Sequence, residues 1–460
     1  MRKLKQHKAQ LTEGPVVKTL ITLTLPMVVG IVGMVTFNLI DTFFVGRLGT
    51  MELAAMSFTF PVILVISSLA MGLGIGTSAV LSHAIGEGDH HKVQRLTTDG
   101  LLLSVLIVTA FTVAGMLTIE PLFRMLGAKG DTIPLIKEYM RIWYIGVPFV
   151  IIPMVGNSAI RATGDTKTPA AIMMVAVIVN LVLDPLLIFG LGPFPRLELE
   201  GAALATVLAR ATTLIVSLVV LSRRENMITL KFPGLKEIFQ SWKQILYIGL
   251  PAAGTSIILP VSIGIVTRLV SAYGPERVAG FGVASRVEIF ALTLILALGT
   301  VIIPFVGQNL GAGKNERIWE GVKFSLLFAM LWGVFVFVLL LFFARQISGI
   351  FNKNPAVIET TALYLIIVSI SYGAQGVFRL GSSILNGLKK PLPAAFLAIV
   401  RMFVFYVPFA LLGSRIFGLR GIFAAAALAN FATALLSFFW IKKALPAGGA
   451  LRIIPGQEKR

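Results

Sequence analysis

The chain has 460 residues, of which 56% are hydrophobic and only 13% are charged. Soluble domains carry about 25% charged residues, so this composition excludes an ordinary soluble protein. A net charge of +19 could indicate a nucleic-acid partner, but the basic residues are scattered through short loops and tails, and no such partner is expected. The lack of cysteine excludes disulfides and thiolate metal sites.

Long apolar stretches predict twelve transmembrane helices. Their approximate ranges are 16–42, 51–83, 95–118, 134–160, 169–190, 201–222, 244–270, 278–307, 320–344, 358–386, 393–413 and 421–441. We therefore expect an all-α membrane protein in two six-helix repeats. Its parts are an N-lobe with helices 1–6 (residues 1–222), a cytoplasmic linker (223–243), a C-lobe with helices 7–12 (244–443) and a cytoplasmic tail (444–460).

The two halves resemble copies of one unit. Pro26 recurs as Pro251 and Gly86 recurs as Gly311, each 225 positions later. Six spans in each half, starting on the same side, give parallel repeats related by an axis along the membrane normal. In such transporters the substrate binds between the repeats, so we expect a central cavity between the lobes.

The basic residues predict the orientation in the membrane. With the N-terminus inside, the inner segments hold 24 of the 40 Lys and Arg residues and the outer loops hold nine. This excess is the positive-inside signal. We therefore expect a multi-pass protein of the cell membrane, surrounded by lipid, with both termini in the cytoplasm, and we expect it to be a monomer.

Asp184 is the strongest candidate for a functional residue, because its span carries no other charge nearby. It lies 15 residues into that span, or about 22 Å, in the outer half of the hydrocarbon. An ionised, unpaired carboxylate is costly there, so it should bind a proton or a cation, or face water. Asn180 lies one turn earlier on the same face. The alternative is a structural hydrogen bond between helices.

Asp41 is a second candidate near the end of the first span, with Asn38 one turn earlier. An interfacial aspartate is the alternative, but the apolar residues that follow favour burial. In the second half, Val266 occupies the position that matches Asp41, and Val407 precedes the proline that matches Pro185. Carboxylates in only one copy of a duplicated scaffold predict a transporter whose coupling ion binds in that copy.

Other polar or helix-breaking residues lie within apolar spans. Pro26 removes a backbone hydrogen bond in mid-span and could let the helix bend, although its repetition as Pro251 also fits a static kink. Tyr139, Asn157 and Thr206 fit either helix packing or a substrate site.

The chain as a whole resembles the multidrug and toxic compound extrusion (MATE) family. The resemblance rests on the repeated twelve-span pattern and on the segments Asp41–Gly46, Gly86–Gly88 and Arg161–Pro169. Carboxylates confined to the first lobe resemble the DinF-like branch, particularly its archaeal members. The family implies V-shaped lobes around a central cavity, alternating access and export of organic cations driven by inward H⁺ or Na⁺.

The resemblance also implies residue roles. Ion coupling falls to Asp41, Asn180 and Asp184, which would also be the ligands if the ion is Na⁺, and bending near Pro26 would follow protonation. Phe37, one turn before Asp41, leaves a polar ligand out of a cation site and favours H⁺. The substrate would meet four polar residues: Asn38, Tyr139, Asn157 and Thr206.

The sequence therefore predicts a secondary active multidrug efflux antiporter. It would export amphipathic or cationic organic compounds in exchange for H⁺ or Na⁺, and would need no cofactor. No phosphate-binding loop, nucleophile–base pair or metal-ligand motif indicates an enzyme. The alternative is a flippase for lipid-linked saccharides or lipids, which Arg379 and Arg401 in second-half spans leave open.

Overall fold

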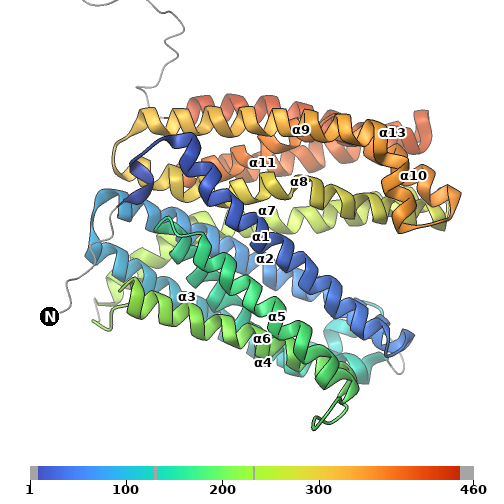
Figure 1. Ribbon diagram of the computed structural model, residues 1–460, viewed down its shortest axis with the longest axis horizontal. Coiled ribbons are helices and arrows are strands. Elements are labelled where there is room, and N and C mark those ends of the chain that lie inside the picture. The colour runs from blue at the N-terminus through green and yellow to red at the C-terminus, as the bar shows by residue number, and fades with distance from the viewer. Residues whose placement is uncertain (1–8, 129–131, 232–233, 446–460) are drawn as a thin grey trace, which may run out of the picture.

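The computed structural model describes residues 9–128, 132–231 and 234–445, and this part of the chain is helical without any strand. The helices, shown in Figure 1, are η1 (Gln10–Thr12), α1 (Val16–Gly46), α2 (Thr50–Glu87), α3 (His90–Met125), α4 (Thr132–Ala162), α5 (Lys167–Phe189), α6 (Glu198–Val219), η2 (Val220–Arg224), α7 (Leu235–Ser271), α8 (Pro275–Gly311), α9 (Asn315–Phe351), α10 (Pro355–Ser369), α11 (Tyr372–Gly387), α12 (Pro391–Ile399), η3 (Val400–Tyr406) and α13 (Val407–Ala444).

The helices account for twelve membrane spans. Ten runs in the described part are long and apolar enough to cross a membrane, and α10 with α11 forms another span that is bent by 62°. The run Pro391–Ala444 has 54 residues, or about 81 Å if straight, whereas the hydrocarbon core is about 30 Å thick. It breaks at Gly418, where φ is 60°, and the backbones of Gly413 and Gly421 meet on either side. This run therefore holds two spans, and the predicted fold is confirmed.

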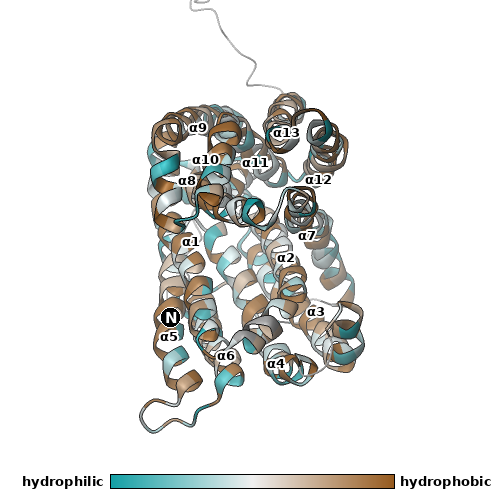
Figure 2. Ribbon diagram, turned by 90° about the vertical axis from the view of Figure 1, so that its right-hand side faces the viewer, coloured by the Kyte–Doolittle hydropathy of each residue, from teal (hydrophilic) through white to brown (hydrophobic). Residues whose placement is uncertain are grey.

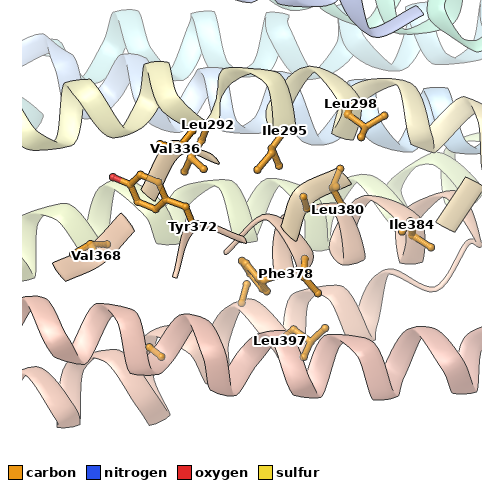
Figure 3. Packing of buried hydrophobic residues seen from close by; sticks show 14 of the residues in the cluster. Leu292, Ile295, Leu298, Val336, Val368, Tyr372, Phe378, Leu380, Ile384 and Leu397 are labelled. Atoms are coloured by element: carbon orange, nitrogen blue, oxygen red, sulfur yellow. The ribbon is translucent and has the colours of Figure 1, made fainter. Parts of the chain in front are cut away.

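The spans form two lobes, each with an apolar core. Figure 2 shows α9, α10, α11 and α13 in one group and α3, α4, α5 and α6 in the other, with α1, α2 and α7 between them. In the C-lobe core, fully buried side chains such as Leu298, Leu380 and Leu397 belong to one apolar cluster (Figure 3).

Helices α1 and α7 each contribute to both lobes. Val16 and Met27 of α1 belong to the C-lobe core, whereas Val45 near its other end belongs to the N-lobe core. In α7 the pattern is reversed, because Ile248 lies in the N-lobe core and Val266 in the C-lobe core. Figure 1 shows α1 running obliquely from one half of the molecule to the other. These two helices therefore straddle the interface between the lobes.

The linker between the repeats is shorter than the predicted range 223–243. η2 continues to Arg224 and α7 begins at Leu235, because the segment that reads as polar is amphipathic. Its Ile238 is buried, and the Trp242 indole donates a hydrogen bond of 2.9 Å to the backbone oxygen of Asp99. The predicted tail lies, from residue 446 onward, outside the described residues.

The two lobes meet at the end of the molecule where α2 and α8 finish. A β-carbon on Gly86 would lie 2.2 Å from the backbone oxygen of Gln308, and one on Gly311 would lie 2.2 Å from that of His83. His83 and Gln308, like Gly86 and Gly311, are 225 positions apart. The same contact is thus made twice, once in each direction, and it requires glycine at both positions.

The loop that joins α4 to α5 is held by Asp165. Its carboxylate accepts hydrogen bonds from the backbone and the hydroxyl of Thr168 at 3.0 and 2.5 Å and pairs with Arg224 at the end of η2. Burial alone would raise the pKa of Asp165, but the hydrogen bonds from Thr168 and Arg224 outweigh it and hold that pKa below its ordinary value. A half-buried carboxylate therefore tethers this loop to the end of η2.

Candidate ion-coupling site

One carboxylate and its amide neighbour come from the buried face of α5. Asn180 and Asp184 are both 0% exposed, and the Asn180 amide donates a hydrogen bond of 2.9 Å to Asp184 Oδ1. The four-residue spacing places the two side chains on one helix face. Their remaining oxygens, Asn180 Oδ1 and Asp184 Oδ2, are buried and have no hydrogen-bond partner among the described residues.

Asp41 reaches this place from α1, which packs closely on α5. Gly30 and Gly33 lie against Met173 and Met174 of α5, so the absence of side chains at these glycines lets the two helices approach. Asp41 follows on the same buried face and is only 7% exposed. Its Oδ1 is also buried without a partner in the part of the chain that the structure describes.

The two carboxylates and a tyrosine form one cluster. Asp41 and Asp184 each lie five residues before the end of their helix, or about 8 Å along the axis, and are therefore at the same depth. They are close enough to interact electrostatically with each other and with Tyr139 of α4. The structure thus brings together Asp41, Asn180, Asp184 and Tyr139 from three helices.

The other residues assigned to substrate binding are more dispersed. Asn157 is buried on α4, but it follows Tyr139 by 18 residues, or about 27 Å of helix, and lies far from the carboxylates. Thr206 on α6 is half-buried, and its hydroxyl oxygen has no partner among the described residues. Asn38 on α1 is exposed, whereas Asp41, three residues later, is buried.

Arg210 on α6 joins the cluster, although sequence reasoning did not single it out. Its guanidinium lies 4.7 Å from the centre of the Phe37 ring, one turn before Asp41, and it interacts electrostatically with Asp41. The count of basic residues that predicts the orientation covers only the inner segments and the outer loops, so it left Arg210 out. A single arginine in an otherwise apolar span is a functional signal in its own right, and that signal was present.

Pro26 lies where α1 passes between the lobes. It is half-buried, and α1 remains helical on both sides of it. The neighbouring Met27 packs in the C-lobe core, and the next buried residues, from Gly30 onward, face α5. Proline at this position leaves one backbone oxygen without its helical partner. The missing hydrogen bond therefore lies where α1 passes from the C-lobe to the N-lobe.

Comparison with known proteins identifies the family. The MatE family model matches residues 26–186 and 251–412, which are the two repeats. The FAD transporter of Shewanella oneidensis is 36% identical, over 93% of this chain and 95% of that protein. The multidrug export protein MepA of Staphylococcus saprophyticus is 24% identical over 89% and 90%. The structure of the Vibrio cholerae MATE transporter VcmN in its bent form matches with a TM-score of 0.89 and 30% identity, covering 96% and 98%. The chain therefore belongs to the MATE family of membrane transporters and is not an enzyme.

Proposed function

We propose that this transporter is a secondary active exporter whose coupling ion binds at Asp41, Asn180 and Asp184. The observation that supports the proposal is the set of three buried oxygens without partners, one on each residue. A carboxylate in this environment is strongly destabilised unless it binds a proton, a cation or water. Gain and loss of the ion therefore change the free energy of the cluster enough to favour one conformation over another.

We further propose that the ion is H⁺ and that Na⁺ is the weaker alternative. The oxygens of the cluster suit a hard cation, so Na⁺ fits by ligand type. However, Na⁺ needs several ligands at once, and the Arg210 guanidinium competes for Asp41. A proton needs only one carboxylate oxygen. Among the described residues, no group of three or more His, Cys, Asp or Glu side chains could hold a metal ion.

The coupling step follows from the position of α1. Neutralising Asp41 and Asp184 removes the repulsion between two carboxylates and lets the end of α1 settle more deeply against α5. Because α1 begins in the C-lobe core and crosses at Pro26, bending there would transmit the change to the lobe interface. The exchange of ion for substrate then proceeds by alternating access between the lobes.

For the substrate we propose amphipathic organic compounds, including cationic drugs. This proposal is supported by the MepA relatives, which are named as multidrug export proteins. A second candidate is an anionic dinucleotide. It is favoured by the relative named as a FAD transporter and by Arg379 and Arg401, two basic residues deep in the C-lobe. We also propose cytoplasmic termini and export across the cell membrane. Each chain carries both lobes, so a monomer would suffice.

The test is transport by the purified protein in liposomes under an imposed H⁺ gradient and then an imposed Na⁺ gradient. A fluorescent cationic dye serves as the substrate. We expect the H⁺ gradient to drive uptake, and Asp184→Asn to abolish it, whereas Glu316→Gln, which neutralises an exposed carboxylate on α9, should transport normally. Driven transport that persists in Asp184→Asn would disprove the coupling role.

A further inference from the structure

One face of α11 carries a row of polar residues that the coupling site does not use. At alternating spacings of three and four residues these are Tyr372, Gln375, Arg379, Ser382 and Asn386. This spacing places them along a single helix face. Each has a buried polar atom that lacks a hydrogen-bond partner among the described residues. Such a row, about 21 Å long, is unfavourable in a membrane protein unless water or a ligand satisfies it.

Arg401 is held beside this row by a hydrogen-bond chain. Its Nε donates to Asn430 Oδ1 at 3.0 Å, and the Asn430 amide donates to Ser371 Oγ at 2.9 Å. The guanidinium also lies 5.2 Å from the centre of the Phe378 ring, a side chain seen in Figure 3. A guanidinium has five N–H groups, and in the described structure only the one on Nε has a protein acceptor. Arg401 is thus fixed in place with most of its donors unused.

The helix that supplies Arg401 is unusual. η3 is a π-helix of seven residues, and π-helical turns are rare and occur frequently at functional sites. Arg379 lies eight residues before the end of α11, and Arg401 lies ten residues after the start of α12. These ends face each other across the short turn 388–390, so the two guanidiniums lie about 12 and 15 Å from the same end of the bundle. Both therefore lie at comparable depth within the hydrocarbon core.

The charges in this part of the C-lobe do not balance. Arg379 and Arg401 are near enough to interact electrostatically. The carboxylate in their neighbourhood is Glu288, and its oxygens accept hydrogen bonds of 2.5 Å from Tyr364 and 2.9 Å from Gln375. Neither arginine forms an ion pair within 4.0 Å in the described part of the chain. Two adjacent, partly buried cations with one carboxylate that is already hydrogen-bonded leave a net positive site, which a bound anion would neutralise.

We propose that Arg379 and Arg401 form an anion subsite in the C-lobe that binds the phosphate group of an amphipathic substrate. Guanidinium groups match phosphate geometry through paired hydrogen bonds, and Phe378 supplies aromatic surface beside Arg401. The subsite rests on the proposed transport function and, of its two substrate candidates, selects the anionic one. The N-lobe carboxylates bind the coupling ion, and the C-lobe arginines recognise the anionic part of the cargo.

The experiment compares binding of FAD and riboflavin to the full-length protein in nanodiscs made from neutral lipid. The two probes share the flavin ring, but only FAD carries phosphates. We expect FAD to bind more tightly than riboflavin. Arg379→Gln and Arg401→Gln should each weaken FAD binding roughly 10- to 100-fold without changing riboflavin binding. Arg345→Gln, which removes an exposed charge from α9, is the matched control and should bind FAD like the wild type.

Further measurements distinguish a loss of the subsite from a folding defect, identify the molecule that carries the phosphate, and test the coupling function independently. Arg401→Lys keeps the charge and should retain part of the affinity, which a misfolded variant would not. If anionic phospholipid binds in an Arg379-dependent way and FAD does not, the phosphate belongs to a lipid and the subsite stands. FAD binding is measured without an ion gradient, so a wild type that binds FAD through these arginines but shows no ion-driven transport would refute the coupling proposal alone. Unchanged FAD affinity in both glutamine variants would overturn the subsite.

Discussion

At the scale of single residues, Arg210 is the side chain whose role the sequence left open and the structure makes specific. It interacts electrostatically with Asp41, and its guanidinium lies over the Phe37 ring. We predict that Arg210→Gln makes transport more responsive to Na⁺, because the competing guanidinium is gone. Arg210→Lys keeps the charge and should behave like the wild type in this respect. The measurement is dye transport under an imposed Na⁺ gradient, and an equal response in both variants would contradict the prediction.

The contrast between Arg210 and the carboxylates explains what could be predicted. Asp41, Asn180 and Asp184 stood out because each lies in an apolar span, and Asn180 and Asp184 share a face by helix geometry alone. The approach of α1 to α5 depends on Gly30 and Gly33, and no one-dimensional pattern reports such a contact. The position of Arg210 beside Phe37 and Asp41 could not be predicted, because only the packing between helices brings these three residues together.

Asp165 gives a prediction about pH. Its pKa is lower in the folded protein than in the unfolded chain, so its contribution to stability is complete above the unfolded value of about 3.9 and is lost as the pH falls through the folded value. We expect Asp165→Asn to lower stability by about 1 kcal/mol at neutral pH. The melting temperatures of wild type and variant should converge below about pH 4. A difference that stays constant between pH 7.5 and pH 3.5 would refute this account.

At the scale of helices, the crossing of α1 makes Pro26 a specific test. Replacing proline by alanine in a helix interior favours the straight helix by about 3 kcal/mol, so Pro26→Ala should resist bending without loss of folding. We predict at least a tenfold lower rate of ion-driven transport. Pro251→Ala makes the same change in α7, where the matching carboxylate is replaced by Val266, and should have a smaller effect. Equal rates in the two variants would indicate a purely architectural role for both prolines.

The glycine contact between α2 and α8 gives a second prediction at this scale. A valine at Gly311 would place its β-carbon 2.2 Å from the backbone oxygen of His83, so the lobes must separate there. Because the chain has no cysteine, Ser82→Cys provides a single reporter at this contact. We predict that the reporter reacts slowly with a soluble maleimide and becomes reactive when Gly311→Val is added. Glu316→Cys, which is exposed, should react in both backgrounds, and an unreactive reporter in Gly311→Val would contradict the prediction.

Helix boundaries and helix partners differ in how far the sequence predicts them. The twelve spans follow from hydropathy, and the predicted spans 393–413 and 421–441 lie on either side of the break at Gly418. The start of α7 was placed nine residues late, because an amphipathic helix at a lobe interface has the composition of a polar linker. Hydropathy does not show that α1 and α7 each pack in both lobe cores, because the two lobes offer similar apolar surfaces to a helix.

At the scale of the whole molecule, the N-terminal segment ties the two lobes together at the end where they already meet. Gln308 of α8 accepts a hydrogen bond of 3.0 Å from the Leu11 amide and donates one of 2.7 Å to the backbone oxygen of Ala162 on α4. Arg317 donates to the backbone oxygen of Gly14 at 2.7 Å. The alternating access that we propose would require these bonds to break whenever this end opens, so their strength would help to set the balance between the two states.

The last prediction follows from that balance. Gln308→Leu removes both hydrogen bonds and leaves a buried amide and a buried carbonyl unpaired, at a cost of about 1–3 kcal/mol each. We predict that it raises the reactivity of the Ser82→Cys reporter and lowers the melting temperature. The matched control is Gln94→Leu, which removes one hydrogen bond to the backbone oxygen of Asn226 without touching the C-lobe. This control should lower stability without exposing the reporter. Equal reporter reactivity in the two variants would show that Gln308 stabilises the fold without biasing its conformation.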